Sequence, residues 1–597
     1  MALSHEKSEA VGVSPDTTHE HLEIAGIAEF DNGEIAPEAI GGTTKDLPPG
    51  YYYRPQFIGT MLAVSLGYIS ATIAYLIPAN LLTVINEDIG PNKNYTWFAI
   101  VWNLASAVGL VFVGRVSDLI GRRWLFIIGN GLGFIGSIIC ATAHSIPVFI
   151  IGGAFIGLAA SVQMSYATVV SELVPNKHRG IALGFLALST VPTQAFGAII
   201  GHALVQYTKQ GWRWVFYLSI ITHCLCITLY FLCYYPPTYH MLHARSRKAI
   251  SLWRMLDPLG AILFTAGLLL FLLGLSWGGQ MYPWKSGKVI GTIVSGAAVL
   301  VAFVFWEIYG AGEYPLIPMK FFRNAGYVGV LGIAGIANAA WAPIVLIWPI
   351  QLTVVWPNSF ILVGWKSCIL QCGTIIGMLA AALLAKTGMQ KCQMITATVI
   401  LTAFLGGMAG TDSTTPTMAL LFILITCIAV GYVEIMAFVI APFCLKPEDI
   451  GIALGLVGTS RSTLSSITQA IFVTILNNKV ASNIPKYVIP SVLSAGLPET
   501  SLAALLQALG TGDFSQVPDI NPSIVAAAVE GNKEAYVHSF KIVYLVGIAF
   551  AVLGIVSGLF VPDCEDKFTD GVARKLHGGS KDSKDKGNTD KQSGAYA

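Results

Sequence analysis

Long apolar stretches separated by short polar segments fill the chain between about residues 56 and 562. A helix needs roughly 20 apolar residues to cross the hydrocarbon core of a bilayer, and windows of that kind occur about fourteen times. The predicted spans are 56–80, 95–115, 124–143, 146–170, 180–205, 214–235, 258–277, 287–309, 325–350, 361–385, 392–411, 416–441, 451–477 and 540–562. Pro343, Pro349 and Pro357 interrupt the pattern around the ninth and tenth spans. The pattern predicts an all-α membrane protein with about 14 transmembrane helices.

Three polar regions flank or interrupt the spans. Residues 1–54 lack the basic start and short apolar core of a cleavable signal peptide, so the first span is expected to direct the chain to the membrane. Residues 478–539 are rich in Pro, Ala and Leu, which favours a short amphipathic helix lying over the outer mouth. Residues 564–597 are rich in Lys, Asp, Gly and Ser and are expected to be a disordered tail.

Loop charges predict the orientation. With the N-terminus inside, the inner loops hold about twice as many Lys and Arg residues as the outer loops, which is the usual cytoplasmic bias. Both termini are therefore expected in the cytoplasm, and 478–539 outside. Asn94-Tyr-Thr96 is then a glycosylation sequon on the outer side, close to the membrane surface.

Composition excludes several classes of protein. Hydrophobic residues make up 54% of the chain and charged residues 11%, whereas a soluble domain carries roughly 25% charged residues. A net charge of +2 gives no bulk field that would attract nucleic acid. The ten cysteines show neither CxxC nor Cys/His spacing, so no metal site or disulfide framework is predicted. The sequence has no phosphate-binding loop and no nucleophile–base set, which argues against an enzyme, a cofactor and an ATP-driven pump.

One motif carries a specific resemblance. Gly114-Arg-Val-Ser-Asp118-Leu-Ile-Gly121-Arg122-Arg123 lies between the second and third spans. Its glycines allow helix ends to approach closely, and its charges could bridge two halves of the molecule. It resembles, without mismatch, the GxxxDxxGRR signature loop of the major facilitator superfamily. A weaker copy, Lys386-Thr-Gly388-Met-Gln-Lys391, stands between the tenth and eleventh spans, as expected for an internal repeat.

Other strings point to a branch of that superfamily. The fourteen spans and Trp212-Arg-Trp214-Val-Phe-Tyr217 resemble the fourteen-helix drug:proton antiporters. Leu47-Pro-Pro-Gly-Tyr51, Ile77-Pro-Ala-Asn80 and Ile85-Asn-Glu-Asp-Ile-Gly90 are similar to the fungal trichothecene efflux pump family, a group near the fungal siderophore–iron transporters. The resemblance covers about residues 47–562.

The resemblance implies a major facilitator fold of two six-helix bundles plus two inserted helices. Residues 55–236 would form the N-terminal bundle, 237–309 a cytoplasmic linker with the two extra helices, and 310–563 the C-terminal bundle. It also implies a monomer in the plasma membrane, or in a vacuolar or vesicular membrane. This monomer would export a small organic secondary metabolite, such as a trichothecene-like sesquiterpenoid, by proton antiport and so give self-resistance.

Two alternatives stay open at this point. Uptake of a ferric siderophore with protons is possible on the same fold. A non-transporting sensor on a transporter scaffold would need a long folded cytoplasmic extension, which the C-terminal tail does not offer.

The sequence departs from the antiporter branch at three places. Ser70 and Ala71 stand where the first helix usually carries an acid, and Gly153 stands where the fourth usually carries an arginine. In the fifth helix, Gly197-Ala-Ile-Ile-Gly201-His202 lacks the usual proline and final glycine. The usual coupling site is therefore absent, and proton handling is expected elsewhere.

Ionisable residues inside spans are the first candidates for that role. Glu434 and Arg461 both lie roughly 12–15 Å from the inner ends of their helices, so they are expected to pair, either as a structural lock or as a coupling site. His202 could titrate near neutral pH, or be a hydrogen-bonded packing residue. Glu172 is expected to pair with Arg122 in the cytoplasmic gate.

Polar and aromatic residues inside the spans could line a cavity for a bulky, uncharged, oxygen-rich amphiphile. The alternative is hydrogen bonding between helices and interfacial aromatic belts. The candidates are Tyr75, Asn80, Asn103, Gln163, Gln194, Asn338, Trp341, Trp348 and Gln371.

Overall fold

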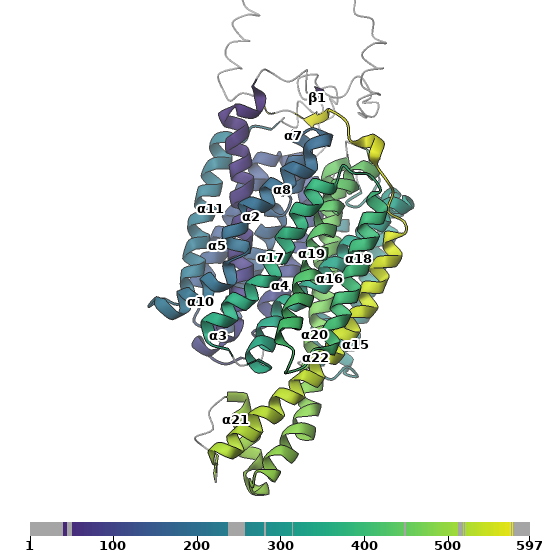
Figure 1. Ribbon diagram of the computed structural model, residues 1–597. Helices are drawn as coiled ribbons and strands as arrows, with labels where there is room; N and C mark the ends of the chain where they lie inside the picture. Colours follow the sequence, from purple (N-terminus) through teal and green to yellow (C-terminus); the bar gives the residue numbers. More distant parts are fainter. Residues whose placement is uncertain are drawn as a thin grey trace, which may run out of the picture.

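The computed structural model describes residues 40–43, 50–92, 94–236, 257–279, 282–312, 315–356, 358–446, 449–511, 517–518, 520–574 and 576. These residues form a long bundle of roughly parallel and antiparallel helices, with both described chain ends at the same end of the bundle (Figure 1). We call this end the termini face and the other end the opposite face.

The first part of the bundle, called here the N-terminal half, runs from α2 to α11. Its helices are α2 Pro55–Asn80, α3 Leu82–Asp88, α4 Trp97–Ile120, α5 Arg122–Ala141, α6 Ile146–Gln163, α7 Tyr166–Leu173, α8 Arg179–Ser189, α9 Val191–Gln194, α10 Gly197–Tyr207 and α11 Arg213–Cys233. The 3-10 turns η1 Tyr51–Tyr53 and η2 Asn176–His178 lie at its termini face.

Two helices, α14 Pro258–Trp277 and α15 Gly287–Tyr309, pack on each other and follow this half. The C-terminal half contains α16 Ala325–Val354, α17 Phe360–Leu384, α18 Gln390–Gly407, α19 Pro416–Ile440, α20 Ile450–Ser494, α21 Leu502–Thr511 and α22 Pro522–Gly558. Short 3-10 turns are η3 Met319–Arg323, η4 Met408–Gly410, η5 Ala441–Cys444, η7 Glu499–Ser501 and η8 Glu565–Lys567. The described strands are β1 Ile40–Thr43 and β2 Gly571–Arg574.

Helices occupy all of the predicted spans, and twelve of those in the described part of the chain are long and apolar enough to cross a membrane. The two remaining spans differ for separate reasons. The fifth span, expected to be one helix, is divided into α8, α9 and α10 around Thr190 and Phe196. The membrane part of α20 is rich in Ser and Thr and contains Arg461, which lowers its mean hydropathy.

The two halves meet along a seam formed mainly by α4 with α20 and by α8 and α10 with α17. Helices in lipid gain little from hydrophobic association and pack through small residues instead. Gly455 shows this closely, because a Cβ atom there would lie 2.8 Å from the Leu110 carbonyl oxygen across the seam. The seam is therefore a tight contact of backbones in this structure.

Residues 478–539 differ from the expected short helix over the outer mouth. Instead, α20 continues without a break to Ser494 and α22 begins at Pro522, so both helices project beyond the opposite face, with α21 beside them (Figure 1). This outer hairpin has its own apolar core, which includes Val488, Val492 and Leu505. Apolar residues at helical spacing, such as Val488 and Val492, let the helices continue beyond the opposite face because they bury a second core.

The C-terminal tail was expected to be disordered from residue 564, and this is wrong for its first part. Residues up to 576 include η8 and β2, and β2 pairs antiparallel with β1, with Gly42 opposite Val572. Val572 is fully buried against a small cluster that contains Tyr51. Backbone pairing and one apolar contact therefore order a segment that composition alone assigned to solvent. Residues 577–597 lie outside the described part of the chain.

We predict that the termini face is cytoplasmic. A membrane-impermeant maleimide should label Ser482→Cys on the outer hairpin in intact spheroplasts, because residue 482 is exposed on the projecting part of α20. Asp566→Cys, exposed at the termini face, should be labelled only after permeabilisation. The unmodified chain controls for its own cysteines, and labelling of Asp566→Cys in sealed cells would contradict this orientation.

Candidate functional site

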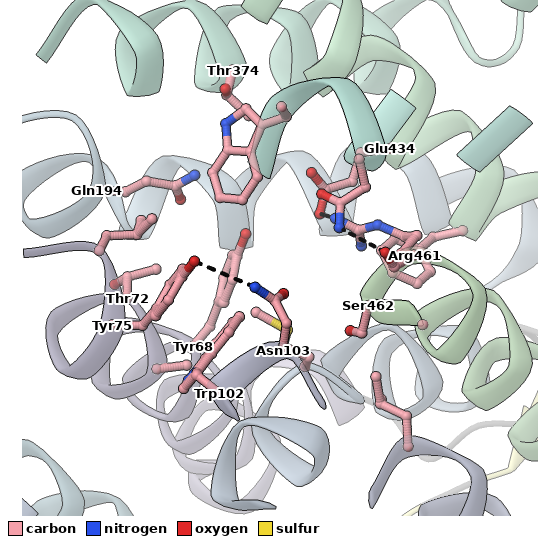
Figure 2. Close-up of a pocket in the computed structure, with 18 of the residues that line it drawn as sticks. Tyr68, Thr72, Tyr75, Trp102, Asn103, Gln194, Thr374, Glu434, Arg461 and Ser462 are labelled. Carbon is pink, nitrogen blue, oxygen red and sulfur yellow. Dashed lines mark hydrogen bonds and ion pairs between the residues drawn. The ribbon is translucent and has the colours of Figure 1, made fainter. Parts of the chain in front are cut away.

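A small cavity of about 60 Å³ lies at the centre of the seam. Both halves line it, and Figure 2 shows aromatic and amide side chains on one side facing a charged pair on the other. The lining from the N-terminal half includes Tyr68, Thr72, Tyr75, Trp102, Asn103, Met164 and Gln194. The lining from the C-terminal half includes Asn338, Trp341, Thr374, Glu434, Phe438, Arg461 and Ser462.

The charged pair is Glu434 of α19 and Arg461 of α20. Arg461 Nη2 lies 2.6 Å from Glu434 Oε1, and the two side chains are only 13% and 11% exposed. The Arg461 guanidinium also lies over the Phe438 ring, 5.2 Å from its centroid. Carboxylate and guanidinium neutralise each other, so the cavity has a polar wall without net charge.

The facing wall is aromatic. Tyr75 stacks on Trp102 with ring centroids 3.8 Å apart and an interplanar angle of 7°. Tyr68 stacks on Tyr166 at 4.6 Å. These rings come from α2, α4 and α7, so the wall depends on packing between three helices. Flat rings of this kind suit the apolar faces of a polycyclic molecule.

An amide bridge crosses the seam beside this wall. Asn103 Nδ2 donates to Gln469 Oε1 at 2.9 Å. Gln469 Nε2 in turn donates to the Tyr75 hydroxyl at 3.3 Å and to the Ala342 carbonyl at 3.0 Å. Gln469 is fully buried. The bridge joins α2 and α4 of one half to α16 and α20 of the other.

A larger cavity of about 520 Å³ lies toward the opposite face, one or two helical turns beyond the bridge. Asn80, Leu346 and Val473 line it, as does His202, whose Nδ1 lies 2.9 Å from the Ala198 carbonyl oxygen. Pockets for drug-sized ligands measure about 300–1,000 Å³. The outer cavity, called here the outer vestibule, has that size and the central cavity does not, so the bridge lies between a large vestibule and a small centre.

Several predicted residues line one of these cavities. Tyr75, Asn103, Gln194, Asn338 and Trp341 line the central cavity, and Asn80 and His202 the outer one. Asn338 Nδ2 donates to Ser465 Oγ at 2.8 Å, which fixes its orientation on α16.

Gln163 lies elsewhere, in a buried network inside the N-terminal half. Its Nε2 donates to Asn130 Oδ1 at 2.9 Å and lies 3.0 Å from His223 Nε2. His223 Nδ1 lies 2.7 Å from the Ser219 carbonyl oxygen, which fits a neutral ring that donates from Nδ1 and accepts at Nε2. Trp348 and Gln371 are also absent from the lining of the central cavity.

The termini face of the seam is closed around the signature motif. Gly114 of α4 lies against α20, where a Cβ atom would be 3.1 Å from Ile452 Cα. Gly121 has a φ of 90°, which lets the chain turn between α4 and α5. The Asp118 side chain lies outside the part of the structure that is described.

The two arginines of the motif have different partners. Arg122 and Glu172 form an ion pair, and both side chains are about 5% exposed. The Arg123 guanidinium lies over the Tyr235 ring at 4.2 Å and bonds to the Phe231 carbonyl oxygen. All of these partners belong to the N-terminal half. Gly114 is the motif residue whose backbone packs directly on α20.

Sequence reasoning missed most of the aromatic wall and the amide bridge. Tyr68, Trp102 and Gln469 carried no signal of their own, because an aromatic or amide residue in an apolar span looks the same whether it faces a cavity or a neighbouring helix. The Glu434–Arg461 contact had a signal, since two opposite charges at equal depth have few other partners in lipid.

Comparison with known proteins gives one family. The model of the fungal trichothecene efflux pump (TRI12) family matches residues 26–596. The trichothecene efflux pump TRI12 of Fusarium sporotrichioides is 28% identical over 93% of this chain and 94% of its own length. The protein of the same name from Trichoderma arundinaceum is 28% identical over 93% of this chain and 94% of its own length.

A solved structure supports the fold. The proton:xylose symporter XylE, bound to 6-bromo-6-deoxy-D-glucose, is 15% identical, covers 86% of this chain and 98% of its own, and has a TM-score of 0.54. This chain is thus a multi-pass membrane protein with the fold of the major facilitator superfamily. The resemblance inferred from the signature loop and the N-terminal strings is thus confirmed, and the chain belongs to the fungal trichothecene efflux pump family.

Proposed function

We propose that this transporter exports an uncharged, oxygen-rich polycyclic metabolite of the trichothecene type in exchange for protons. Its relatives are named as efflux pumps for such compounds, and the family contains transporters rather than enzymes. The observation that carries the proposal is the central cavity, whose lining combines stacked rings and amides with hydroxyl groups and an ion pair.

This lining favours one class of ligand. Rings such as Tyr75 and Trp102 offer apolar faces, whereas Asn338, Gln194 and Ser462 offer hydrogen bonds to hydroxyl, epoxide or ester oxygens. An ionic ligand would meet no net charge, because Glu434 already pairs with Arg461. A neutral amphiphile avoids the cost of desolvating a charge.

The state of the structure fits the end of an export cycle. The termini face is closed, the centre is too small for a polycyclic ligand, and the outer vestibule is large. Loading from the other side would require the halves to separate at the termini face and the central cavity to widen. Glu434 is a carboxylate in the cavity lining, and we propose it as the site of proton exchange.

A paired transport assay tests the proposal. Fungal cells that lack the transporter are loaded with a labelled trichothecene, and in parallel are offered a labelled ferric siderophore. Expression of this chain should accelerate toxin efflux and leave siderophore uptake unchanged. Siderophore uptake without toxin efflux would overturn the proposal and support the uptake function instead.

Three further features belong to this proposal. The plasma membrane is the site where export would give self-resistance, and the chain would work there as a monomer. Asn94 lies just before α4 on the opposite face, where its carbonyl accepts from Trp97 N at 2.9 Å. This position would present Asn94 to the glycosylation machinery if that face is outside.

A further inference from the structure

The segment after α22 crosses the termini face from one half of the transporter to the other. We call residues 563–576, apart from residue 575, the strap. It leaves the C-terminal half at the end of α22, passes η8 and ends in β2 beside α7 (Figure 1). Neither the central cavity nor the signature motif includes it.

The first part of the strap is fixed to the C-terminal half. Asp563 Oδ1 accepts from Lys391 N at 2.9 Å, and Glu565 Oε1 accepts from Met389 N at 2.8 Å. Both carboxylates thereby satisfy free N–H groups at the start of α18, a favourable position for negative charge. The Phe568 ring packs against Phe443 of η5 with centroids 5.2 Å apart.

The second part is fixed to the N-terminal half. The Thr569 carbonyl oxygen accepts from Lys177 N at 3.0 Å, and Thr569 Oγ1 accepts from Asn176 Nδ2 at 3.2 Å. Asp570 forms an ion pair with the Lys177 ammonium. Beyond them, β2 pairs with β1, and Leu576 N donates to the Tyr51 hydroxyl at 2.9 Å.

The change of partner takes place between two consecutive residues. Phe568 packs on the C-terminal half and Thr569 bonds to the N-terminal half, and neighbouring Cα atoms are only about 3.8 Å apart. The strap therefore has no spare length at the seam. If the halves separate at the termini face, at least one set of these contacts must break.

We propose that the strap is part of the inner gate and detaches from the N-terminal half in every transport cycle. This rests on the movement of the two halves in the proposed export function, but on no particular substrate. The contacts of Thr569 and Asp570 with η2 are the first to release, because the Lys177–Asp570 pair is exposed to solvent, at 38% and 52%, whereas Val572 beyond them is fully buried beside Tyr51. Exposed ion pairs hold weakly, whereas Phe568 is anchored next to the covalent connection to α22.

The histidine beside this contact carries little charge near neutral pH. Burial lowers the pKa of His178 below its ordinary value, and Lys386 and Lys177 lower it further, against the opposing effect of Asp570. His178 therefore adds little positive charge beside the Lys177–Asp570 pair.

A pair of cross-links tests the proposal. Asn176→Cys with Thr569→Cys, joined by a short reducible bifunctional thiol reagent, ties the strap across the seam. Lys391→Cys with Asp563→Cys ties it to its own half and is the matched control. The seam-crossing link should reduce labelling of Ile452→Cys, at the start of α20, in inside-out vesicles. It should also stop transport until the link is reduced. The control link should change neither.

Charge exchange gives a second, independent measurement. Asp570→Lys should raise the labelling rate of Ile452→Cys severalfold, because two lysines then repel at the seam. Lys177→Asp combined with Asp570→Lys should return the rate to that of the parent. Labelling of Ile452→Cys does not require the substrate. The assay therefore tests the strap even if the proposed substrate is wrong. Full transport with the seam-crossing link in place, or labelling indifferent to Asp570→Lys, would overturn the proposal.

Discussion

Glu434→Gln is expected to lose most transport and most of its dependence on external pH. The substitution keeps the size of the side chain but leaves the Arg461 guanidinium in a cavity wall where it is only 13% exposed. Removing one partner of a buried ion pair costs about 3–5 kcal/mol. A glutamine also cannot bind and release a proton as the cavity opens to one side and then the other.

The measurements separate a coupling role from a structural one. Transport is followed between acidic and neutral external pH, and membrane expression is quantified in parallel. Glu434→Gln with Arg461→Gln should recover expression better than either single change, because no uncompensated charge remains. Glu530→Gln is the matched control, since Glu530 is 62% exposed on the outer hairpin and its pairing with Lys533 should contribute less than about 1 kcal/mol.

Two results would contradict this account. Unchanged pH dependence in Glu434→Gln would remove the coupling role and leave the pair as a structural lock. Additive losses of expression in the double variant would show that the two side chains do not depend on each other.

Gly114→Leu should hold the termini face open and reduce transport about tenfold or more. A Cβ atom at this position meets Ile452 Cα at 3.1 Å and the Gly451 carbonyl oxygen at 3.2 Å, and these are backbone atoms that cannot rotate away. Overpacking of this kind typically costs about 1–3 kcal/mol. That cost is enough to shift the equilibrium from the closed toward the open state about tenfold.

The control lies on the next helix. A Cβ atom added at Gly131 of α5 would meet no other atom within 4 Å, so Gly131→Leu should leave transport near that of the parent. Accessibility of Ile452→Cys from the termini face should rise with Gly114→Leu and not with Gly131→Leu. Equal transport in the two variants would show that close approach of α4 and α20 is unimportant for closure.

The sequence was sufficient for those features that depend on lipid as solvent. The positions of the spans follow from their apolar length, and the pairing of Glu434 with Arg461 follows from equal depth, because a charge in lipid requires a partner. The contact between Arg122 and Glu172 was expected for the same reason, although its role in gating stays a prediction.

Features that depend on which side of a helix faces a cavity could not be predicted. Gln163 and Gln194 are both amides within spans, yet one lies in a network with His223 and the other lines the cavity. The interruptions of the fifth span set the position of Gln194, and an apolar window does not report them. Pairing of β1 with β2 could not be predicted either, because strands of four residues at opposite ends of the chain are too short to show an alternating apolar pattern.

The outer hairpin should amplify any tilt of the C-terminal half. Because α20 and α22 run without a break from the C-terminal half into this hairpin, a tilt of that half within the membrane must swing the tip, near Ser494, through a larger arc. The part of α20 beyond residue 477 alone adds about 25 Å of lever at 1.5 Å per residue. A fluorophore or an antibody fragment placed on the tip would thus report the motion of the membrane core from beyond the opposite face, away from the central cavity.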